Sequence, residues 1–136
     1  LNSGLMLYRV KYDKPALFGQ IRYALHLPQF LSYLLTRQPV SDMTSIGCHT
    51  TLWDFPNQQY HPWVLAEGLD NVLGPILPGD AMLPAAALSD VTTDRNLPVG
   101  IGLHDSSAAL IPYLASFDEP FLLISTGTWC ISMNPF

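Results

Sequence analysis

The first forty residues place apolar and polar positions in a pattern that predicts two short helices. Apolar residues at helical spacing favour a helix over residues 14–21, and an extended segment follows over residues 23–27. Pro28 suits the first turn of a second helix, expected over residues 29–36, because its fixed φ and missing N–H cost little there. This helix is expected to bury four apolar side chains: Phe30, Leu31, Leu34 and Leu35.

The middle of the chain has a weaker pattern. Residues 41–44 are rich in capping side chains and predict the start of a short helix, with Asp42 as its cap. Residues 50–53 have the composition of a strand, and residues 63–69 favour a helix. Because prolines recur through residues 70–98, we expect mostly ordered loop there.

A strand, a helix and a hairpin are predicted after Pro98. Residues 99–103 alternate apolar residues with glycine, as a buried strand does where other backbone packs close. The segment Asp105-Ser106-Ser107 offers N-cap side chains for a helix that continues to residue 114. A second buried strand over residues 121–124 and a returning strand over residues 129–133 complete an α/β arrangement.

The composition predicts that the chain packs against further polypeptide. Only 12% of the residues are charged, 49% are hydrophobic, and the mean hydropathy is +0.21. A free-standing domain of this size needs more polar residues than this to cover its surface. The first residue is also Leu1 and not a methionine, so we expect a segment of a longer protein whose remainder covers part of the apolar surface.

Charge and cysteine content remove several classes of protein. The net charge is -5 and the six basic residues are scattered, which argues against nucleic-acid binding. Prolines interrupt the longest apolar stretch, so no membrane span is expected, and no signal peptide is visible. Cys48 and Cys130 have no paired spacing, and we interpret them as reduced thiols of a cytoplasmic protein.

Asp105 is the first candidate for chemistry. It follows an apolar strand and opens a predicted helix, the place where open α/β sheets bind ligands. A carboxylate that faces a cleft there can orient a hydroxyl group and accept its proton. The same position also suits a residue that only caps the helix, and the spacing leaves both interpretations open.

The second candidate is the turn Thr126-Gly127-Thr128, which follows a predicted strand. The backbone N–H groups and hydroxyls of such a turn can face an anion, which would make it a phosphate-binding site without a basic residue. An ordinary glycine hairpin has the same composition, so the turn alone does not decide between the two.

Taken together, the segment from His104 to Ser107 and the later segment from Leu123 to Trp129 resemble the FGGY carbohydrate kinases. The resemblance implies that Asp105 is the catalytic base and that His104 and Asp105 contact the sugar. It also implies that Thr126, Gly127 and Thr128 bind a phosphate of ATP, with Mg²⁺ as the accompanying ion. The upstream segments that match the family, in its order, are residues 14–18, 23–28, 33–36, 40–45, 51–54 and 71–78.

The resemblance implies a partial ribonuclease H-like (actin-like ATPase) fold of the α/β class. Residues 1–116 would form the carboxyl part of the sugar-binding first domain, and residues 117–136 would open the ATP-binding second domain. The implied activity is transfer of the γ-phosphate of ATP to a hydroxyl of a ketose. A histidine before the aspartate is more similar to the L-fuculose and L-rhamnulose kinase branches than to the xylulose branch, which remains an alternative. The implied partners are a sugar, ATP and the remainder of the chain, and a homodimer stays open.

Two departures from the family and two rival functions remain. The family's first phosphate motif, Asp-x-Gly-Thr, and its adenine-binding part are absent, and Cys48-His49 stands where relatives often carry Ala-Ser. One rival is a non-catalytic, actin-like nucleotide-binding module. The other is a metal-dependent phosphohydrolase with His104 and Asp105 as ligands, although His26, His49 and His61 lack metal-ligand spacing.

Overall fold

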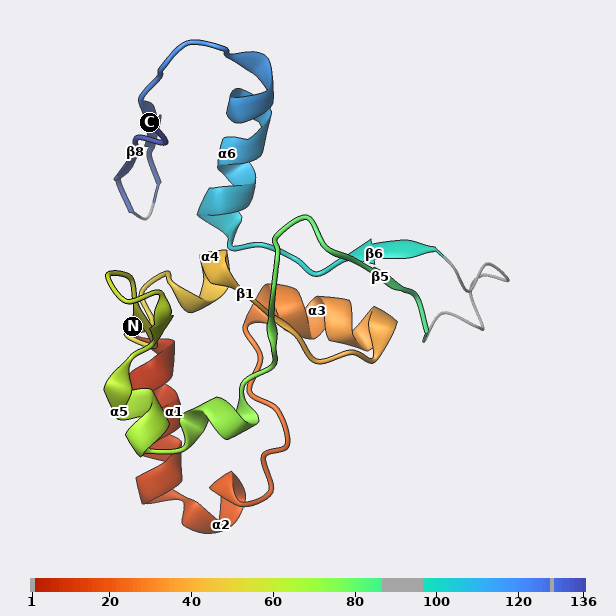
Figure 1. Ribbon diagram of the computed structural model, residues 1–136, viewed down its shortest axis with the longest axis vertical. Helices are drawn as coiled ribbons and strands as arrows, with labels where there is room; N and C mark the ends of the chain where they lie inside the picture. The colour runs from red at the N-terminus through yellow and green to blue at the C-terminus, as the bar shows by residue number, and fades with distance from the viewer. Residues whose placement is uncertain (1, 87–96, 128) are drawn as a thin grey trace. The chain divides into compact units, whose positions relative to one another are not determined.

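The computed structural model describes residues 2–86, 97–127 and 129–136 (Figure 1). The chain divides into unit 1, Leu1–His104, and unit 2, Asp105–Phe136. This division reflects contacts within the chain. The predicted boundary between residues 116 and 117 concerns the domains of a longer protein and stays a prediction.

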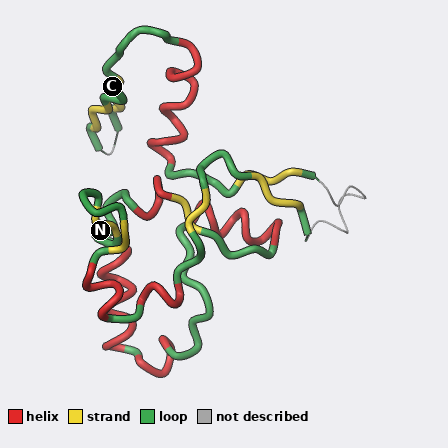
Figure 2. Tube along the Cα trace, in the orientation of Figure 1, coloured by secondary structure: helices red, strands yellow, loops and turns green. Residues whose placement is uncertain are grey.

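Unit 1 combines short helices with strands of two or three residues (Figure 2). Its described helices are α1 (Ser3–Asp13), α2 (Pro15–Phe18), α3 (Leu27–Thr36), α4 (Met43–Ile46), α5 (Pro62–Ala66) and the 3-10 helix η1 (Leu69–Val72). Its described strands are β1 (Ser41–Asp42), β2 (Trp53–Asp54), β3 (Gln59–Tyr60), β4 (Ile76–Leu77), β5 (Met82–Pro84) and β6 (Pro98–Gly100).

The strands of the described residues pair two by two. In unit 1, β1 pairs with β4 in parallel, whereas β2 with β3 and β5 with β6 are antiparallel. The parallel pair joins Ser41 to Ile76 and Asp42 to Leu77. Asp42 therefore ends a strand and caps the helix that follows, since its Oδ1 accepts from the Ser45 N–H at 2.9 Å. The predicted capping role of Asp42 is confirmed.

The hydrophobic core of unit 1 draws on segments that are distant in the sequence. Ile46, Leu52, Val64 and Leu69 are buried together, each at most 1% exposed. Burial of an aliphatic side chain of this size stabilises a fold by roughly 1.5–3 kcal/mol. Partly buried side chains pack against this cluster: Leu7, Phe18, Trp53, Tyr60, Trp63, Leu73 and Ile76.

Helix α1 is an element that the sequence pattern did not predict. The side chain of Asn2 caps it by accepting from the Leu5 N–H at 3.2 Å. Gly4 is its buried residue, and a Cβ built there would lie 2.3 Å from the Thr50 carbonyl oxygen. The helix therefore packs its backbone closely on the 50–52 segment, and this contact does not require an apolar stripe.

Helix α3 forms where predicted, but the side chains it buries are polar and not the apolar ones expected. It begins at Leu27 with Pro28 in its first turn and ends at Thr36. Its buried residues are Gln29, Ser32 and Thr36, whereas Leu31 is 53% exposed. The predicted burial of Phe30, Leu31 and Leu34 is wrong within this chain, and Leu35 is only half-buried.

Two predicted strands are shorter than expected for local reasons. The segment over residues 50–53 is a strand only from Trp53. Thr51 has a φ of 58°, which a strand does not allow. The Thr50 hydroxyl donates to the Ile46 carbonyl and accepts from the Leu52 N–H. The segment over residues 99–103 is a strand only to Gly100, because Gly102 has a φ of 85°.

Unit 2 consists of α6 (Asp105–Ser116) and the antiparallel pair β7 (Leu123–Ser125) and β8 (Ile131–Met133). The predicted helix and hairpin are thus confirmed, and α6 continues through Pro112. The predicted burial of the strand over residues 121–124 is wrong, because each described residue of unit 2 is at least partly exposed.

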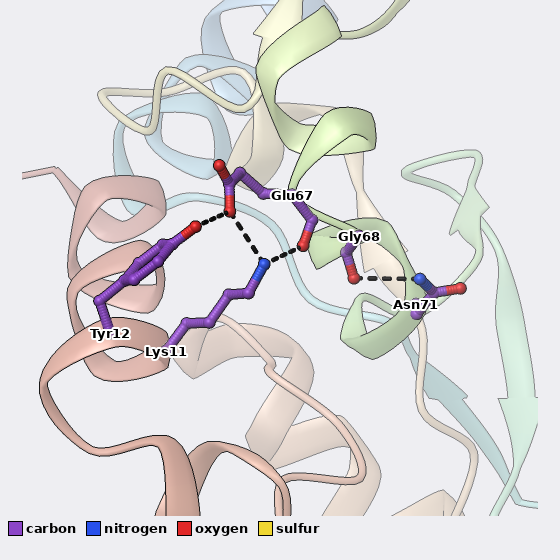
Figure 3. A network of polar contacts seen from close by, with 5 residues as sticks. All are labelled: Lys11, Tyr12, Glu67, Gly68 and Asn71. Carbon is purple, nitrogen blue, oxygen red and sulfur yellow. Dashed lines mark hydrogen bonds and ion pairs between the residues drawn. The ribbon is translucent and has the colours of Figure 1, made fainter.

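A polar network joins α1 to the end of α5 (Figure 3). Lys11 Nζ donates to Glu67 Oε2 at 2.8 Å and to the Glu67 carbonyl at 2.6 Å, and the Tyr12 hydroxyl donates to the same carboxylate at 2.7 Å. The hydrogen bonds from Lys11 and Tyr12 lower the pKa of Glu67. The hydrogen bond to Glu67 raises the pKa of Tyr12 to about 12.

Within the described ranges, no helix combines the length and the apolar character that crossing a bilayer requires.

Candidate functional site

Asp105 is the first residue of α6, and its side chain is exposed. Its Oδ1 accepts from the Ser106 backbone N–H at 2.6 Å and from the Ser106 hydroxyl at 3.3 Å. These contacts orient the carboxylate at the start of the helix, where the helix dipole favours a negative charge. The position suits both the capping role and contact with a ligand.

The backbone that leads to Asp105 is held by a buried side chain of α3. Gln29 is fully buried, and its Nε2 donates to the Gly102 carbonyl at 2.7 Å. Gly102 also lies directly against Pro28, since a Cβ built on it would be 2.8 Å from the Pro28 Cβ. The predicted close approach of backbone in this glycine-containing segment is confirmed.

A second buried group holds the residue immediately before Asp105. The His104 N–H donates to Thr44 Oγ1 at 2.9 Å, and Thr44 Oγ1 itself donates to Asp42 Oδ1 at 2.5 Å. Asp42 is 1% exposed, so this carboxylate is a buried acceptor. The polar chain from Asp42 through Thr44 ends on the backbone of His104, a residue predicted to contact the sugar.

Histidine side chains lie within electrostatic range of this chain of polar groups. Burial lowers the pKa of His26, the nearby His104 lowers it further, and the charge of Asp42 opposes this shift. The Ser3 hydroxyl lies 3.0 Å from His26 Nε2. The lowered pKa favours a neutral His26 imidazole, which suits the structural role expected for it.

The predicted phosphate turn lies between β7 and β8. Thr126 and Gly127 are exposed, and a Cβ built on Gly127 would meet no atom within 4 Å. The phosphate-binding role of this turn stays a prediction. Thr128, the third residue of this candidate site, lies outside the described residues.

The predicted site residues therefore fall into two sets. His104 is half-buried at the end of unit 1, and Asp105 follows it in the sequence. Asp105, Thr126 and Gly127 belong to unit 2 and are all exposed, so neither the carboxylate nor the turn is sealed inside the described chain.

The described part of the chain contains no group of three His, Cys, Asp or Glu side chains placed to hold a metal ion. The phosphohydrolase alternative would need further ligands around His104 and Asp105.

Gln29 and Thr44 are the residues that sequence analysis missed. Neither is ionisable, and each acts through a backbone atom more than 50 positions away in the sequence. The one available signal is the spacing Asp42-x-Thr44 at a helix start, where a hydroxyl can reach back to the capping carboxylate.

No protein-family model and no curated protein matches this sequence. Solved structures do match it. A carbohydrate kinase from Novosphingobium aromaticivorans is similar over 98% of this chain, with a TM-score of 0.84 and 30% sequence identity. The chain spans only 30% of the length of that protein.

A ligand-bound xylulose kinase from Lactobacillus acidophilus is similar over 84% of this chain and 24% of its own, with a TM-score of 0.69 and 17% identity. This second likeness concerns the fold alone. The first likeness supports the resemblance of the sequence to carbohydrate kinases, and both likenesses support the implied actin-like fold.

Proposed function

We propose that this chain is part of an ATP-dependent carbohydrate kinase of the FGGY type. The observation that carries the proposal is the likeness to a carbohydrate kinase over 98% of the chain, at a TM-score of 0.84 and 30% identity. The ordered sequence motifs support the same family independently of the coordinates.

In this proposal Asp105 is the general base. Its carboxylate orients the acceptor hydroxyl of the sugar and takes its proton as the oxygen bonds to the γ-phosphorus of ATP. The bond from that phosphorus to the β–γ bridging oxygen breaks, and ADP leaves. The exposed position of Asp105 at the opening of α6 allows this contact. Phosphoryl transfer depends mainly on positioning and electrostatic stabilisation, and a general base contributes about 10²–10⁴-fold to its rate.

The turn of the β7–β8 hairpin is proposed to bind an ATP phosphate through Thr126, Gly127 and Thr128. Mg²⁺ is expected to enter with ATP, and no described residue of this chain is assigned to it. Because ATP is the phosphate donor, we expect the enzyme to act in the cytoplasm.

The acceptor is proposed to be a ketose of the L-fuculose or L-rhamnulose type. The support is the His104-Asp105 pair, which resembles these branches of the family. His104 is half-buried and directly precedes the proposed base, which is the basis for proposing that it contacts the sugar. A panel that includes L-fuculose, L-rhamnulose and D-xylulose distinguishes these acceptors from one another.

The test is the substitution Asp105→Ala in the intact protein, assayed by coupled ADP release with the ketose panel. We expect a loss of kcat of about 10²–10⁴-fold, because the proton acceptor is removed. Asp118→Asn is the matched control, since Asp118 is an exposed carboxylate of the same unit. An Asp105→Ala enzyme that turns over within about threefold of wild type would refute the assignment.

Isothermal titration of the intact protein with ATP and Mg²⁺ separates the kinase from a non-catalytic module that has lost nucleotide binding. A protein that binds ATP but phosphorylates no sugar of the panel would instead favour the binding-module alternative.

A further inference from the structure

The segment between β6 and α6 has no regular secondary structure, yet side chains from other elements hold it. Strand β6 ends at Gly100 and α6 begins at Asp105. The Ile101 N–H donates to the Ala81 carbonyl at 3.3 Å, which continues the β5–β6 pairing by one hydrogen bond. From there to Asp105, Gln29 of α3 bonds the Gly102 carbonyl and Thr44 of α4 bonds the His104 N–H.

Thr44 makes the last of these contacts before the proposed base. A threonine hydroxyl has one proton and two acceptor positions. In Thr44 the proton goes to Asp42 Oδ1 at 2.5 Å, and the hydroxyl oxygen accepts the His104 N–H at 2.9 Å. The donor side of the hydroxyl is thus occupied by a carboxylate, which leaves its lone pairs for the His104 amide.

The Asp42 carboxylate, which accepts the hydrogen bond from Thr44, is itself held in place. Asp42 is 1% exposed, ends the parallel strand β1, and caps α4 through the Ser45 N–H. Hydrogen bonds to an ionised acceptor are shorter and stronger than those between neutral groups. The position of the His104 amide is therefore set by the core of unit 1 through two hydrogen bonds.

We propose that Thr44 is a positioning residue for the reaction. By holding the His104 N–H it sets the path of the backbone into Asp105, and so the place from which the carboxylate meets the sugar hydroxyl. This inference rests on the proposed function of Asp105 as the base. Because a displacement of about 1 Å can cost about a hundredfold in rate, a lost anchor one residue away should be visible in kcat.

The test uses Thr44→Val, which keeps the shape of the side chain and removes the hydroxyl, and Thr44→Ser, which restores the hydroxyl. In the intact protein we expect Thr44→Val to lower kcat by about ten- to a hundredfold, with the KM for ATP changed less than about twofold. Thr44→Ser should recover most of the lost rate. If the valine variant does not fold, Thr44→Ala carries the same expectation without the added methyl group.

The matched control is Thr36→Val. Thr36 is also a threonine within unit 1 whose hydroxyl donates to one group, the Ser32 carbonyl, and accepts from one backbone N–H, that of Gln38. Its loss should leave kcat within about threefold of wild type, although stability falls. An equal loss of kcat in both variants would show a general effect of destabilisation and overturn the inference.

Two further measurements separate the inference from the proposed function. Hydrogen exchange at the His104 amide should be faster in Thr44→Val and unchanged in Thr36→Val, whatever the activity. When Asp105 is already replaced by alanine, adding Thr44→Val should lower kcat by less than about threefold, because the carboxylate that Thr44 positions is absent. If Asp105→Ala lowers kcat but Thr44→Val does not, the positioning role of Thr44 is refuted while Asp105 is still supported as the base. If Asp105→Ala leaves kcat unchanged, the proposed base falls, and the role of Thr44 falls with it.

Discussion

Gly102 illustrates how a single backbone position shapes the approach to the proposed base. Its φ of 85° lies in a region that side chains other than glycine rarely adopt, and its backbone packs on Pro28. A Cβ there would be 2.8 Å from the Pro28 Cβ and 2.9 Å from its backbone, so neither conformation nor space allows one. The glycine lets the chain turn between β6 and α6 while Gln29 binds its carbonyl.

We therefore expect Gly102→Ala to lower the free energy of unfolding of the intact protein by about 1–3 kcal/mol, measured by chemical denaturation. Gly100→Ala is a control from the same segment, because the nearest atom to a Cβ at Gly100 is 3.9 Å away. The control should stay within about 0.5 kcal/mol of wild type. Equal losses in the two variants would contradict the role given to the conformation of Gly102.

Gly127 presents the opposite case. A Cβ there would meet no atom within 4 Å, so the Cβ of a substituted residue adds no clash with the rest of the described chain. We expect Gly127→Val to raise the KM for ATP in the intact enzyme, because the isopropyl group occupies the space proposed for a phosphate. Initial rates at varied ATP, with Gly127→Ala as an intermediate step, provide the measurement. A KM that is the same in all three proteins would argue against a phosphate site at this turn.

At the scale of elements, α3 shows that a hydrophobic pattern can identify a helix and still misplace its buried face. The spacing of Leu31, Leu34 and Leu35 indicated the helix correctly. The face that unit 1 buries instead carries Gln29, Ser32 and Thr36. Gln29 donates to the Gly102 carbonyl, and the Thr36 hydroxyl donates to the Ser32 carbonyl in the last turn of the helix. Side chains that satisfy backbone groups leave no periodic signal in the sequence.

The network between α1 and α5 offers a test through pH. The hydrogen bond to the Glu67 carboxylate raises the pKa of Tyr12 from its ordinary value of 10 to about 12. The protonated tyrosine therefore stabilises the fold fully below pH 10, and this contribution is lost as the pH rises from 10 toward 12. Glu67→Gln should move the pKa of Tyr12 downward toward 10, since the charged acceptor is removed. NMR titration of ¹³C-labelled tyrosine measures the shift.

The control for this titration is Asp13→Asn, which removes a carboxylate at the end of the same helix. Asp13 is bound to Arg9 at 2.8 Å and takes no part in the network. The pKa of Tyr12 should therefore stay near its wild-type value in this variant. A fall as large as that in Glu67→Gln would show a general charge effect and not the hydrogen bond.

At the scale of the whole molecule, the low charge of the chain corresponds to apolar surface that its own residues leave uncovered. In unit 2, Trp129 is 71% exposed, and Leu122 and Phe136 are each about 60% exposed. Four aromatic side chains contact one another, yet each of them stays at least partly exposed: Tyr113, Phe117, Phe121 and Phe136. That further polypeptide covers this surface, as the composition suggested, stays a prediction.

The sequence by itself determined the local elements whose signals lie in neighbouring residues. The proline at the start of α3, the capping aspartate of α4 and the glycine turn between β7 and β8 act over a few residues, so their composition was sufficient. The ordered motifs likewise led to a kinase family that the structural likeness supports.

Tertiary structure alone decided which faces are buried and how the proposed base is held. Helix α1 forms on a close backbone contact between Gly4 and Thr50, and Gln29 and Thr44 hold backbone atoms more than 50 residues away. Such contacts depend on the direction and distance of single hydrogen-bonding groups. These quantities exist only once distant segments are folded against each other.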